Sequence, residues 1–226
     1  MSQSLKSLFA EVIHPHAAAV KQMVAENGSF KLGEITLGQV YSGMKGMVGM
    51  ITETSNLDPE DGIRFRGISI PELRELLPNA SGGTEPLPEG IFFLMLTGKV
   101  PTAEQVKELS EDWEKRSEVP AHVFAALDVL PLNTHPMTQF SIAILAMRTE
   151  SIFAAEYEKG INKKDYWDPT FEDSMNLIAR LPRVAAYIYR RTYHNNEHIA
   201  PKKGLDWSAN FCLLYTSPSP RDRGNH

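Results

Sequence analysis

The chain has 226 residues, of which 42% are hydrophobic and 23% are charged, and its formal net charge is -5 at pH 7. A chain of this length can bury a substantial core, whereas its mild negative charge gives no broad attraction for nucleic acids or anionic membranes. With one cysteine, Cys212, it can form neither an intramolecular disulfide nor a cysteine-rich zinc site, which favours a reducing compartment, and no apolar run reaches the roughly 18 to 20 residues that span a bilayer.

The first predicted helix covers residues 5–26, with a kink expected at Pro15. Its apolar residues recur at helical spacing: Leu5, Leu8, Phe9 and Val12. Between residues 30 and 70 the apolar runs are short and glycines interrupt them, a pattern typical of small strands and turns. This is the only part of the chain that favours β-structure.

Residues 57–101 predict a short hairpin followed by two helices, each with a start and a stop signal. Ser69 can cap the first helix, and Pro78 stops it. Pro88 opens the second helix, which is apolar on nearly all sides until Gly98 closes it. We therefore expect the second helix to be buried rather than to lie on the surface.

Three helices are predicted in the middle of the chain. Thr102 and Gln105 have the spacing of a capping box, which starts a helix. Pro120 introduces the next helix and Pro136 the third. The third helix has one apolar side with Met137, Phe140, Ile144 and Met147, and a second with Ile142 and Leu145. Because such a helix needs burial on both sides, it favours an oligomer.

The last third of the chain predicts three more helices. Ser151 and Gly160 bracket a short one, and Asp168 is expected to cap a long one that bends at Pro182 and ends near residue 193. Asp206 begins another helix. Together these elements predict a mainly α fold with a small β-hairpin region near the amino terminus.

Several strings, in this order along the chain, carry a family resemblance. They include Leu57-Asp58-Pro59-Glu60-Asp61-Gly62-Ile63-Arg64-Phe65-Arg66-Gly67, Glu85-Pro86-Leu87-Pro88-Glu89-Gly90, Asn133-Thr134-His135-Pro136-Met137 and Asp206-Trp207-Ser208-Ala209-Asn210-Phe211. Together they resemble the amino-terminal half of citrate synthases of the mitochondrial, eukaryotic type. The resemblance implies a partial, multi-helical large domain over residues 1–211. Residues 212–226 depart from the family pattern, and we expect them to be a non-homologous tail that is disordered or a sequence artefact.

The resemblance also implies a reaction. Citrate synthases condense acetyl-CoA with oxaloacetate and water to give citrate and CoA, with an aspartate and two histidines as the reacting acid and base groups. Those histidines lie in Gly-Pro-Leu-His-Gly-like and Gly-Tyr-Gly-His-like strings, and neither string occurs in this chain. We therefore expect no catalytic residue within it and no synthase activity from this chain alone.

Two lysines are candidate contacts of the CoA phosphates by resemblance. Lys45 stands where relatives have an arginine that contacts CoA, and flanking glycines would permit close backbone approach. Lys163 likewise replaces an arginine that reaches CoA from the neighbouring subunit. Lysine keeps the positive charge but lacks the planar guanidinium fork, so phosphate binding would be less directional. The alternative is that each is an ordinary solvated lysine at a turn.

The resemblance further implies a homodimer, acetyl-CoA as a substrate, and no permanently bound cofactor. It places the intact enzyme in the mitochondrial matrix, although the first residues contain no arginine-rich presequence, so a cytosolic form is the alternative. Two other functions remain open: a 2-methylcitrate synthase, which condenses propionyl-CoA, and a short, non-catalytic isoform that acts as a helical dimerisation module.

Other polar residues favour structural roles. His194 and His198 are four residues apart, but two asparagines separate them and no third ligand follows, so we predict no metal site. His135 is expected to pack or to cap a helix. We expect two groups of arginines to be structural: Arg64 and Arg66 in a strand, paired with carboxylates, and Arg180, Arg183, Arg190 and Arg191 in a solvated or subunit-facing stripe.

Overall fold

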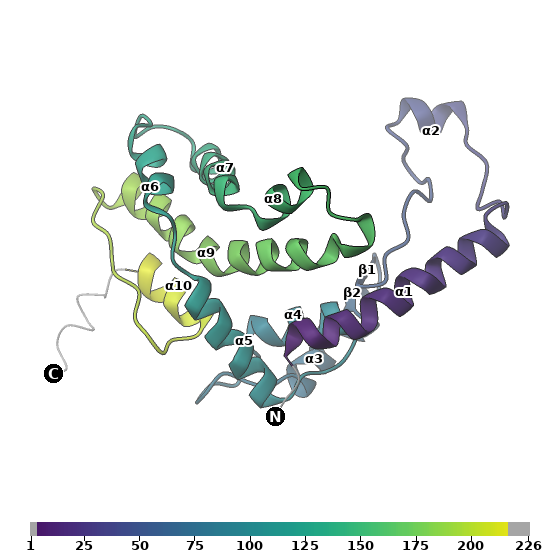
Figure 1. The fold of residues 1–226 in the computed structure, drawn as a ribbon, viewed down its shortest axis with the longest axis horizontal. Helices are drawn as coiled ribbons and strands as arrows, with labels where there is room; N and C mark the ends of the chain where they lie inside the picture. The colour runs from purple at the N-terminus through teal and green to yellow at the C-terminus, as the bar shows by residue number, and fades with distance from the viewer. Residues whose placement is uncertain (1–3, 217–226) are drawn as a thin grey trace. The chain divides into compact units, whose positions relative to one another are not determined.

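The computed structural model describes residues 4–216, and the chain divides into two compact units, Met1–Val106 and Lys107–His226. Helices are the main regular structure of both units, and the one sheet among the described residues is small (Figure 1). The predicted mainly α fold with a small β region near the amino terminus is therefore confirmed.

The first unit begins with helix α1, Leu5–Asn27, which Ser4 caps by accepting a hydrogen bond from the Ser7 amide. Pro15 lies inside α1, and the helix continues through it (Figure 1). Leu5 and Leu8 are buried, and α1 contacts α4, Pro88–Thr97. The predicted first helix is confirmed.

A three-stranded antiparallel sheet forms the predicted hairpin region. Strand β1, Ser55–Asp58, pairs with β2, Gly62–Phe65, which in turn pairs with β3, Ile68–Ser69. Helix α3, Ile70–Leu76, follows β3 directly, and the Ser69 hydroxyl and the Glu72 carboxylate close its capping box. The sheet and the start of α3 thus form one continuous segment, held by hydrogen bonds between residues that are close in sequence.

Helix α4 is buried as its composition predicts, with Phe93 and Leu94 each 1% exposed. Leu94 packs with Leu73 and Leu77 in the core of this unit. Gly98 ends α4 with a φ of 72°, in the left-handed region that favours glycine.

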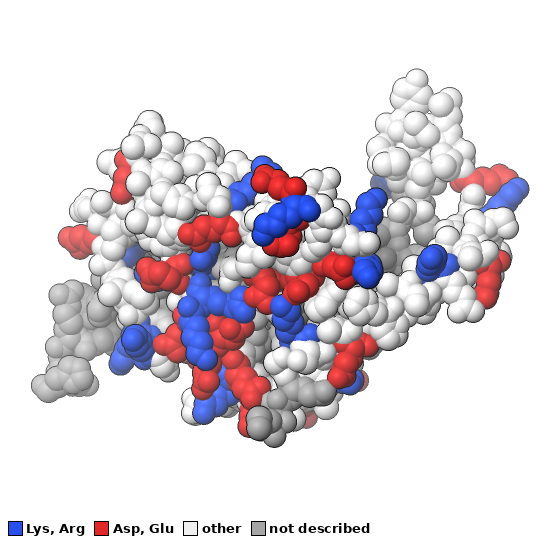
Figure 2. All heavy atoms as spheres, in the orientation of Figure 1, with Lys and Arg blue, Asp and Glu red and all other residues white. Residues whose placement is uncertain are grey.

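One short helix was not predicted: α2, Leu37–Tyr41. It lies in a largely apolar, exposed stretch between α1 and the sheet, where Phe30 and Tyr41 are 74% and 86% exposed. Figure 2 shows almost no charge over the α2 lobe, whereas elsewhere on this face acidic and basic side chains lie interleaved. The capping box between Thr36 and Gln39 starts α2. The many glycines nearby in the sequence favoured a prediction of strands and turns over this segment.

The second unit is helical. Its helices are, in chain order, α5 Ala103–Arg116, α6 Ala121–Asp128, α7 Pro136–Met147, α8 Ile152–Glu158, α9 Trp167–Tyr193 and α10 Trp207–Tyr215. The first turn of α5 belongs to the first unit. Two 3-10 turns, Arg148–Glu150 and Lys163–Asp165, flank α8. Helix α9 contacts α7, α8 and α10 (Figure 1). The core gathers Val119, Val123, Leu127, Ala143, Met147, Val184 and Ile188.

Two helix boundaries differ from the prediction. Helix α9 begins at Trp167, so Asp168 lies in its first turn instead of capping it. Helix α10 continues to Tyr215, past the expected domain boundary at residue 211, and buries Leu214. The rest of the predicted tail, residues 217–226, lies outside the described residues.

Helix α7 buries one side within the second unit. Gln139, Ala143 and Met147 face the core, whereas Met137 and Leu145 are 62% and 69% exposed. The described chain therefore leaves part of each predicted apolar side uncovered, because Met137 belongs to the first side and Leu145 to the second. Over residues 4–216, none of the helices has the length and apolar character that crossing a membrane requires.

Candidate functional site

Lys45 lies in a tight turn just after α2. Gly43, Met44 and Gly46 have φ values of 69°, 62° and 73°, and the Met44 amide donates to the Gln39 carbonyl at 2.8 Å. Two of these left-handed positions are glycines, which adopt them without steric cost. The Lys45 side chain is exposed and makes no ion pair or hydrogen bond with the described residues. It is therefore available to an anion from solvent.

Lys163 opens the 3-10 turn between α8 and α9. The Asn162 side chain accepts a hydrogen bond from the Lys164 amide at 3.1 Å, which fixes the start of the turn. Beside the turn, Phe153, Tyr157 and Tyr166 form an aromatic cluster with centroid separations of 5.2 to 6.1 Å. The Lys163 side chain is exposed and has no partner in the part of the chain that the structure describes.

The two candidate lysines belong to different units. Lys45 lies in Met1–Val106 and Lys163 in Lys107–His226, so the structure describes two separate cationic positions. Each combines a defined backbone turn with a free ammonium group, which can pair with a phosphate oxygen as a point charge.

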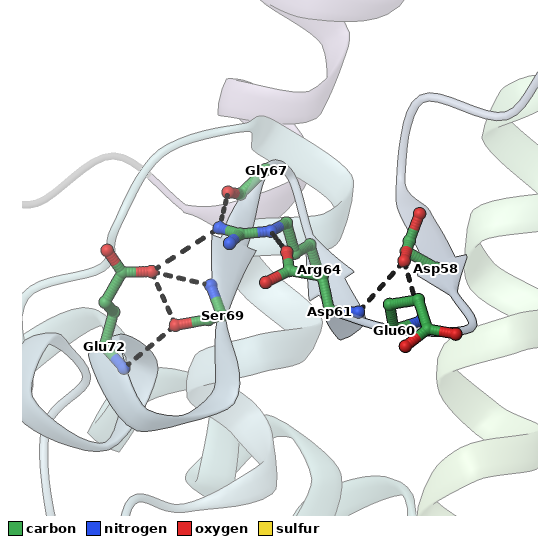
Figure 3. Close-up of polar contacts among 7 residues, drawn as sticks. All are labelled: Asp58, Glu60, Asp61, Arg64, Gly67, Ser69 and Glu72. Carbon is green, nitrogen blue, oxygen red and sulfur yellow. Dashed lines mark hydrogen bonds and ion pairs between the residues drawn. The ribbon is translucent and has the colours of Figure 1, made fainter.

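A polar cluster in the first unit surrounds the hairpin (Figure 3). The Arg64 guanidinium donates to Asp61 Oδ2 at 2.6 Å and to the Gly67 carbonyl at 3.3 Å, and it lies 3.9 Å from Glu72 Oε2. The hydrogen bond and the charge of Arg64 lower the pKa of Asp61. The hydroxyl and amide of Ser69 lower the pKa of Glu72.

A third carboxylate in this cluster, that of Asp58, accepts hydrogen bonds from the amides of Asp61 and Glu60 at 2.9 and 2.8 Å, which lower its pKa. These carboxylates hold a turn and a helix start while ionised, so they lack the raised pKa of a general acid. The prediction that Arg64 pairs with carboxylates is confirmed.

Arg66 does not follow that prediction. Its φ is 49°, which places it in a turn between β2 and β3, and its guanidinium donates to the Met95 carbonyl in α4. The pairing with a carboxylate was therefore wrong for Arg66, because the turn directs its side chain to a backbone acceptor near the end of α4.

The arginines of α9 also differ from the expected surface stripe. Arg180 pairs with Glu150 and Arg183 with Glu118, although both arginine side chains are largely buried. Arg190 and Arg191 are each only 5% exposed, so a solvated stripe was wrong for both. Their guanidinium groups can be buried because they reach polar acceptors: Arg190 donates to the Glu197 carbonyl, and Arg191 to Gln139 and to the Leu130 carbonyl.

The histidines take structural positions. His135 caps α7, with its Nδ1 atom accepting from the Met137 amide at 3.2 Å, which confirms the capping role. His194 and His198 contact Tyr189 and Tyr187, respectively. No group of three or more histidine, cysteine, aspartate or glutamate side chains is placed to hold a metal ion within residues 4–216.

Comparison with known proteins identifies the family of this chain. A family model described as "Citrate synthase, C-terminal domain" matches residues 43–224. The chain is 52% identical over 220 residues to "Citrate synthase, mitochondrial" of Daucus carota, covering 96% of this chain and 47% of that protein. It is 50% identical over 211 residues to "2-methylcitrate synthase, mitochondrial" of Yarrowia lipolytica, covering 93% of this chain and 45% of that protein. The chain thus spans about half the length of these relatives.

Solved structures share the fold. The citrate synthase of Pyrobaculum aerophilum matches with a TM-score of 0.66 at 21% identity, over 82% of this chain and 45% of that chain. A ternary complex of the Thermoplasma acidophilum citrate synthase with carboxymethyl coenzyme A and oxaloacetate matches with a TM-score of 0.59 at 22% identity, over 77% of this chain and 41% of that chain. With the family model covering most of its length, this chain belongs to the citrate synthase family.

Proposed function

We propose that this chain supplies the helical scaffold of a citrate synthase, an enzyme that condenses acetyl-CoA with oxaloacetate and water to give citrate and CoA. The observation that carries the proposal is the 52% identity to a mitochondrial citrate synthase over 96% of this chain. The similarity extends over 220 residues of the chain. The intact enzyme is an acyltransferase that needs no permanently bound cofactor.

The reacting groups lie outside this chain. The proposal assigns no catalytic residue to it, because the two histidine strings of the family do not occur in its sequence. Its role is to hold the fold and to present two cations, and without the acid and base groups it does not lower the barrier to condensation. This chain alone is therefore inactive.

Lys45 and Lys163 contact the CoA phosphates in the proposed enzyme. Both ammonium groups are exposed and without partners among the described residues, and each sits on a turn fixed by its own backbone contacts. A charge-assisted hydrogen bond from an ammonium group to a phosphate oxygen needs this combination of a positioned backbone and a free donor. Lys163 would serve the site of the neighbouring subunit.

The proposed enzyme is a homodimer of the mitochondrial matrix. The exposed apolar residues of α7, Met137 and Leu145, offer surface that a second subunit would cover. The matrix is proposed from the names of the relatives, which are mitochondrial.

A second candidate is 2-methylcitrate synthase, because the Yarrowia lipolytica enzyme is 50% identical to this chain. The two functions differ in the acyl group that they accept, propionyl in place of acetyl. One methylene in an apolar pocket changes specificity by only about 10- to 200-fold, so the ratio of kcat/KM for the two thioesters separates them.

A chimaeric enzyme tests the proposal. Residues 4–211 of this chain would replace the matching residues of the Daucus carota enzyme, and release of free CoA thiol would be followed with oxaloacetate and either acetyl-CoA or propionyl-CoA. We expect turnover, with acetyl-CoA preferred. A folded, soluble chimaera without turnover would contradict the proposal, and a preference for propionyl-CoA would favour 2-methylcitrate synthase.

A further inference from the structure

A cavity of about 370 Å³ lies in the second unit, between α9 and the segment that follows it. Most of its wall is apolar or aromatic, with contributions from Phe124, Ala186, Tyr187, Ile199, Pro201 and Leu214. Its volume falls within the roughly 300 to 1,000 Å³ of small-molecule pockets. Sequence reasoning missed it, because the residues that line it come from α6, α9, α10 and a loop.

One wall of the cavity carries a buried charge. Arg190 is only 5% exposed, and its Nε atom donates to the Glu197 carbonyl. Its Nη1 atom is buried and has no hydrogen-bond partner within residues 4–216, and no described carboxylate pairs with the guanidinium. The position in the last turn of α9 stabilises a cation only in part. A buried cation without a counterion is costly, and an anion beside it would offset that cost.

The other polar groups on the cavity wall already have partners. Arg183 donates to the Ser117 carbonyl and to Glu118. The Tyr187 hydroxyl donates to Asp128 at 2.7 Å, and His198 Nε2 lies 2.8 Å from Asn196 Oδ1. Arg190 is thus the cation on this wall that lacks an acidic partner, and a single negative charge on a ligand would match it.

The aromatic side chains on the cavity wall stack on one another. The rings of Phe124 and Tyr187 stack with centroids 4.4 Å apart, and Tyr187 stacks on His198 at 3.9 Å. Because Phe124 and His198 cover the two faces of Tyr187, an apolar ligand would contact the edge of the Tyr187 ring and the neighbouring apolar side chains. The wall therefore suits a ligand whose body is aromatic or otherwise apolar.

We propose that this cavity binds a small monocarboxylate with an aromatic or apolar body, whose carboxylate accepts hydrogen bonds from the Arg190 guanidinium. The ligand body lies against Phe124, Tyr187 and Leu214. The charge is matched by one guanidinium, and the body replaces water at apolar walls. This site is independent of the CoA contacts assigned to Lys45 and Lys163.

Benzoate tests the proposal on the purified chain, with benzamide as a neutral compound of the same shape. Binding would be followed by ligand-observed NMR titration and by the shift in the thermal unfolding midpoint. We expect saturable binding of benzoate and at least tenfold weaker binding of benzamide. If benzoate does not bind, or if benzamide binds equally well, the proposal is wrong.

Two variants and a control locate the bound benzoate. Arg190→Gln removes the charge, and we expect at least a tenfold rise in the Kd of benzoate. Arg148→Gln, the same change at an exposed arginine outside this cavity, should leave the Kd within about twofold. Where Arg190→Gln does not fold, Ala200→Trp decides, because it fills the cavity from an exposed position and keeps Arg190. Unchanged binding in the folded Arg190→Gln or in Ala200→Trp would overturn the proposal.

Discussion

The ring of Tyr187 lies flat on the imidazole of His198, with centroids 3.9 Å apart and planes 4° from parallel. The contact joins α9 to the loop that follows it, and the Tyr187 hydroxyl continues it by donating to Asp128 in α6. Burial and the hydrogen bond to Asp128 raise the pKa of Tyr187 to about 12, so the hydroxyl remains a donor throughout the physiological range. The loop is thereby fixed to the helical core of the second unit.

This contact predicts a dependence of stability on pH. Burial lowers the pKa of His198 below its ordinary value of 6.5, with Arg190 adding to the effect and Asp128 opposing it. The unfolded chain therefore takes up the proton first, so the contribution of neutral His198 is present above pH 6.5 and is lost as the pH falls below it. Urea midpoints at about pH 7.5 and about pH 5 should differ more for the natural chain than for His198→Phe, which keeps the stacked ring. The assignment of this pH dependence to His198 would be contradicted if the midpoint difference were the same in His198→Phe as in the natural chain, or if a His194→Phe control reduced it equally.

Alanine substitutions at Gly98 and Gly33 test whether the backbone conformation of Gly98 requires glycine. A Cβ atom would meet nothing within 4 Å at either position, but Gly98 has a φ of 72° and ends α4. Gly98→Ala should therefore lower the free energy of unfolding by about 1 to 2 kcal/mol, because alanine is strained in the left-handed region. Gly33→Ala should change it by less than about 0.5 kcal/mol. Chemical denaturation of both variants measures the difference. Equal losses of stability would show that the left-handed conformation at Gly98 does not strain alanine.

Arg116 connects α5 to α9 within the second unit. Its guanidinium donates to Asp112 at 2.9 Å and to Glu172 at 2.7 Å, and these bonds outweigh the effect of burial and raise its pKa. Glu172 is only 21% exposed, so Arg116→Leu would leave a largely buried carboxylate without this partner. We expect a loss of about 2 to 4 kcal/mol in the free energy of unfolding.

The control for Arg116 is an ion pair on the surface. Lys107 and Glu111 are 77% and 52% exposed and lie 3.8 Å apart. Because solvent screens such pairs, Lys107→Ala should change stability by less than about 0.5 kcal/mol. A similar loss in both variants, measured by urea denaturation, would show that burial of the ion pair does not determine how much stability is lost when one partner is removed.

Lys45 is tested in the chimaeric enzyme. Lys45→Ala should raise the KM for acetyl-CoA by about tenfold or more, since it removes the proposed charged donor to phosphate, while the KM for oxaloacetate stays unchanged. Lys31→Ala, at another exposed lysine of the same unit, is the control and should leave both values unchanged. Lys45→Arg should retain tight binding. An unchanged KM in Lys45→Ala removes Lys45 from the CoA site.

Much of the fold could be predicted from local signals in the sequence. Ser69, Thr102 and Asp206 each cap the helix whose start they mark, and Pro88 and Gly98 bracket α4. These predictions succeed because caps and stops depend on contacts within three or four residues. The fold therefore follows from sequence wherever the deciding contact is local.

Where distant contacts decide, sequence reasoning failed. Arg190 and Arg191 have the composition of a surface stripe, yet they are buried because Glu197 and Leu130 bring backbone acceptors from outside the helix. Lys45 and Lys163 pose the opposite difficulty, because an exposed lysine without partners looks the same whether or not it binds a phosphate. Only the family resemblance distinguishes them, and the cavity beside Arg190 leaves no signal in the sequence.

The most direct test of the account is the release of free thiol by the purified 226-residue chain supplied with acetyl-CoA and oxaloacetate. The active chimaera serves as the positive control in the same assay. We predict a rate indistinguishable from the blank without protein, because the chain provides the family scaffold without its reacting histidines. Thiol release that grows in proportion to the concentration of this chain would contradict that conclusion.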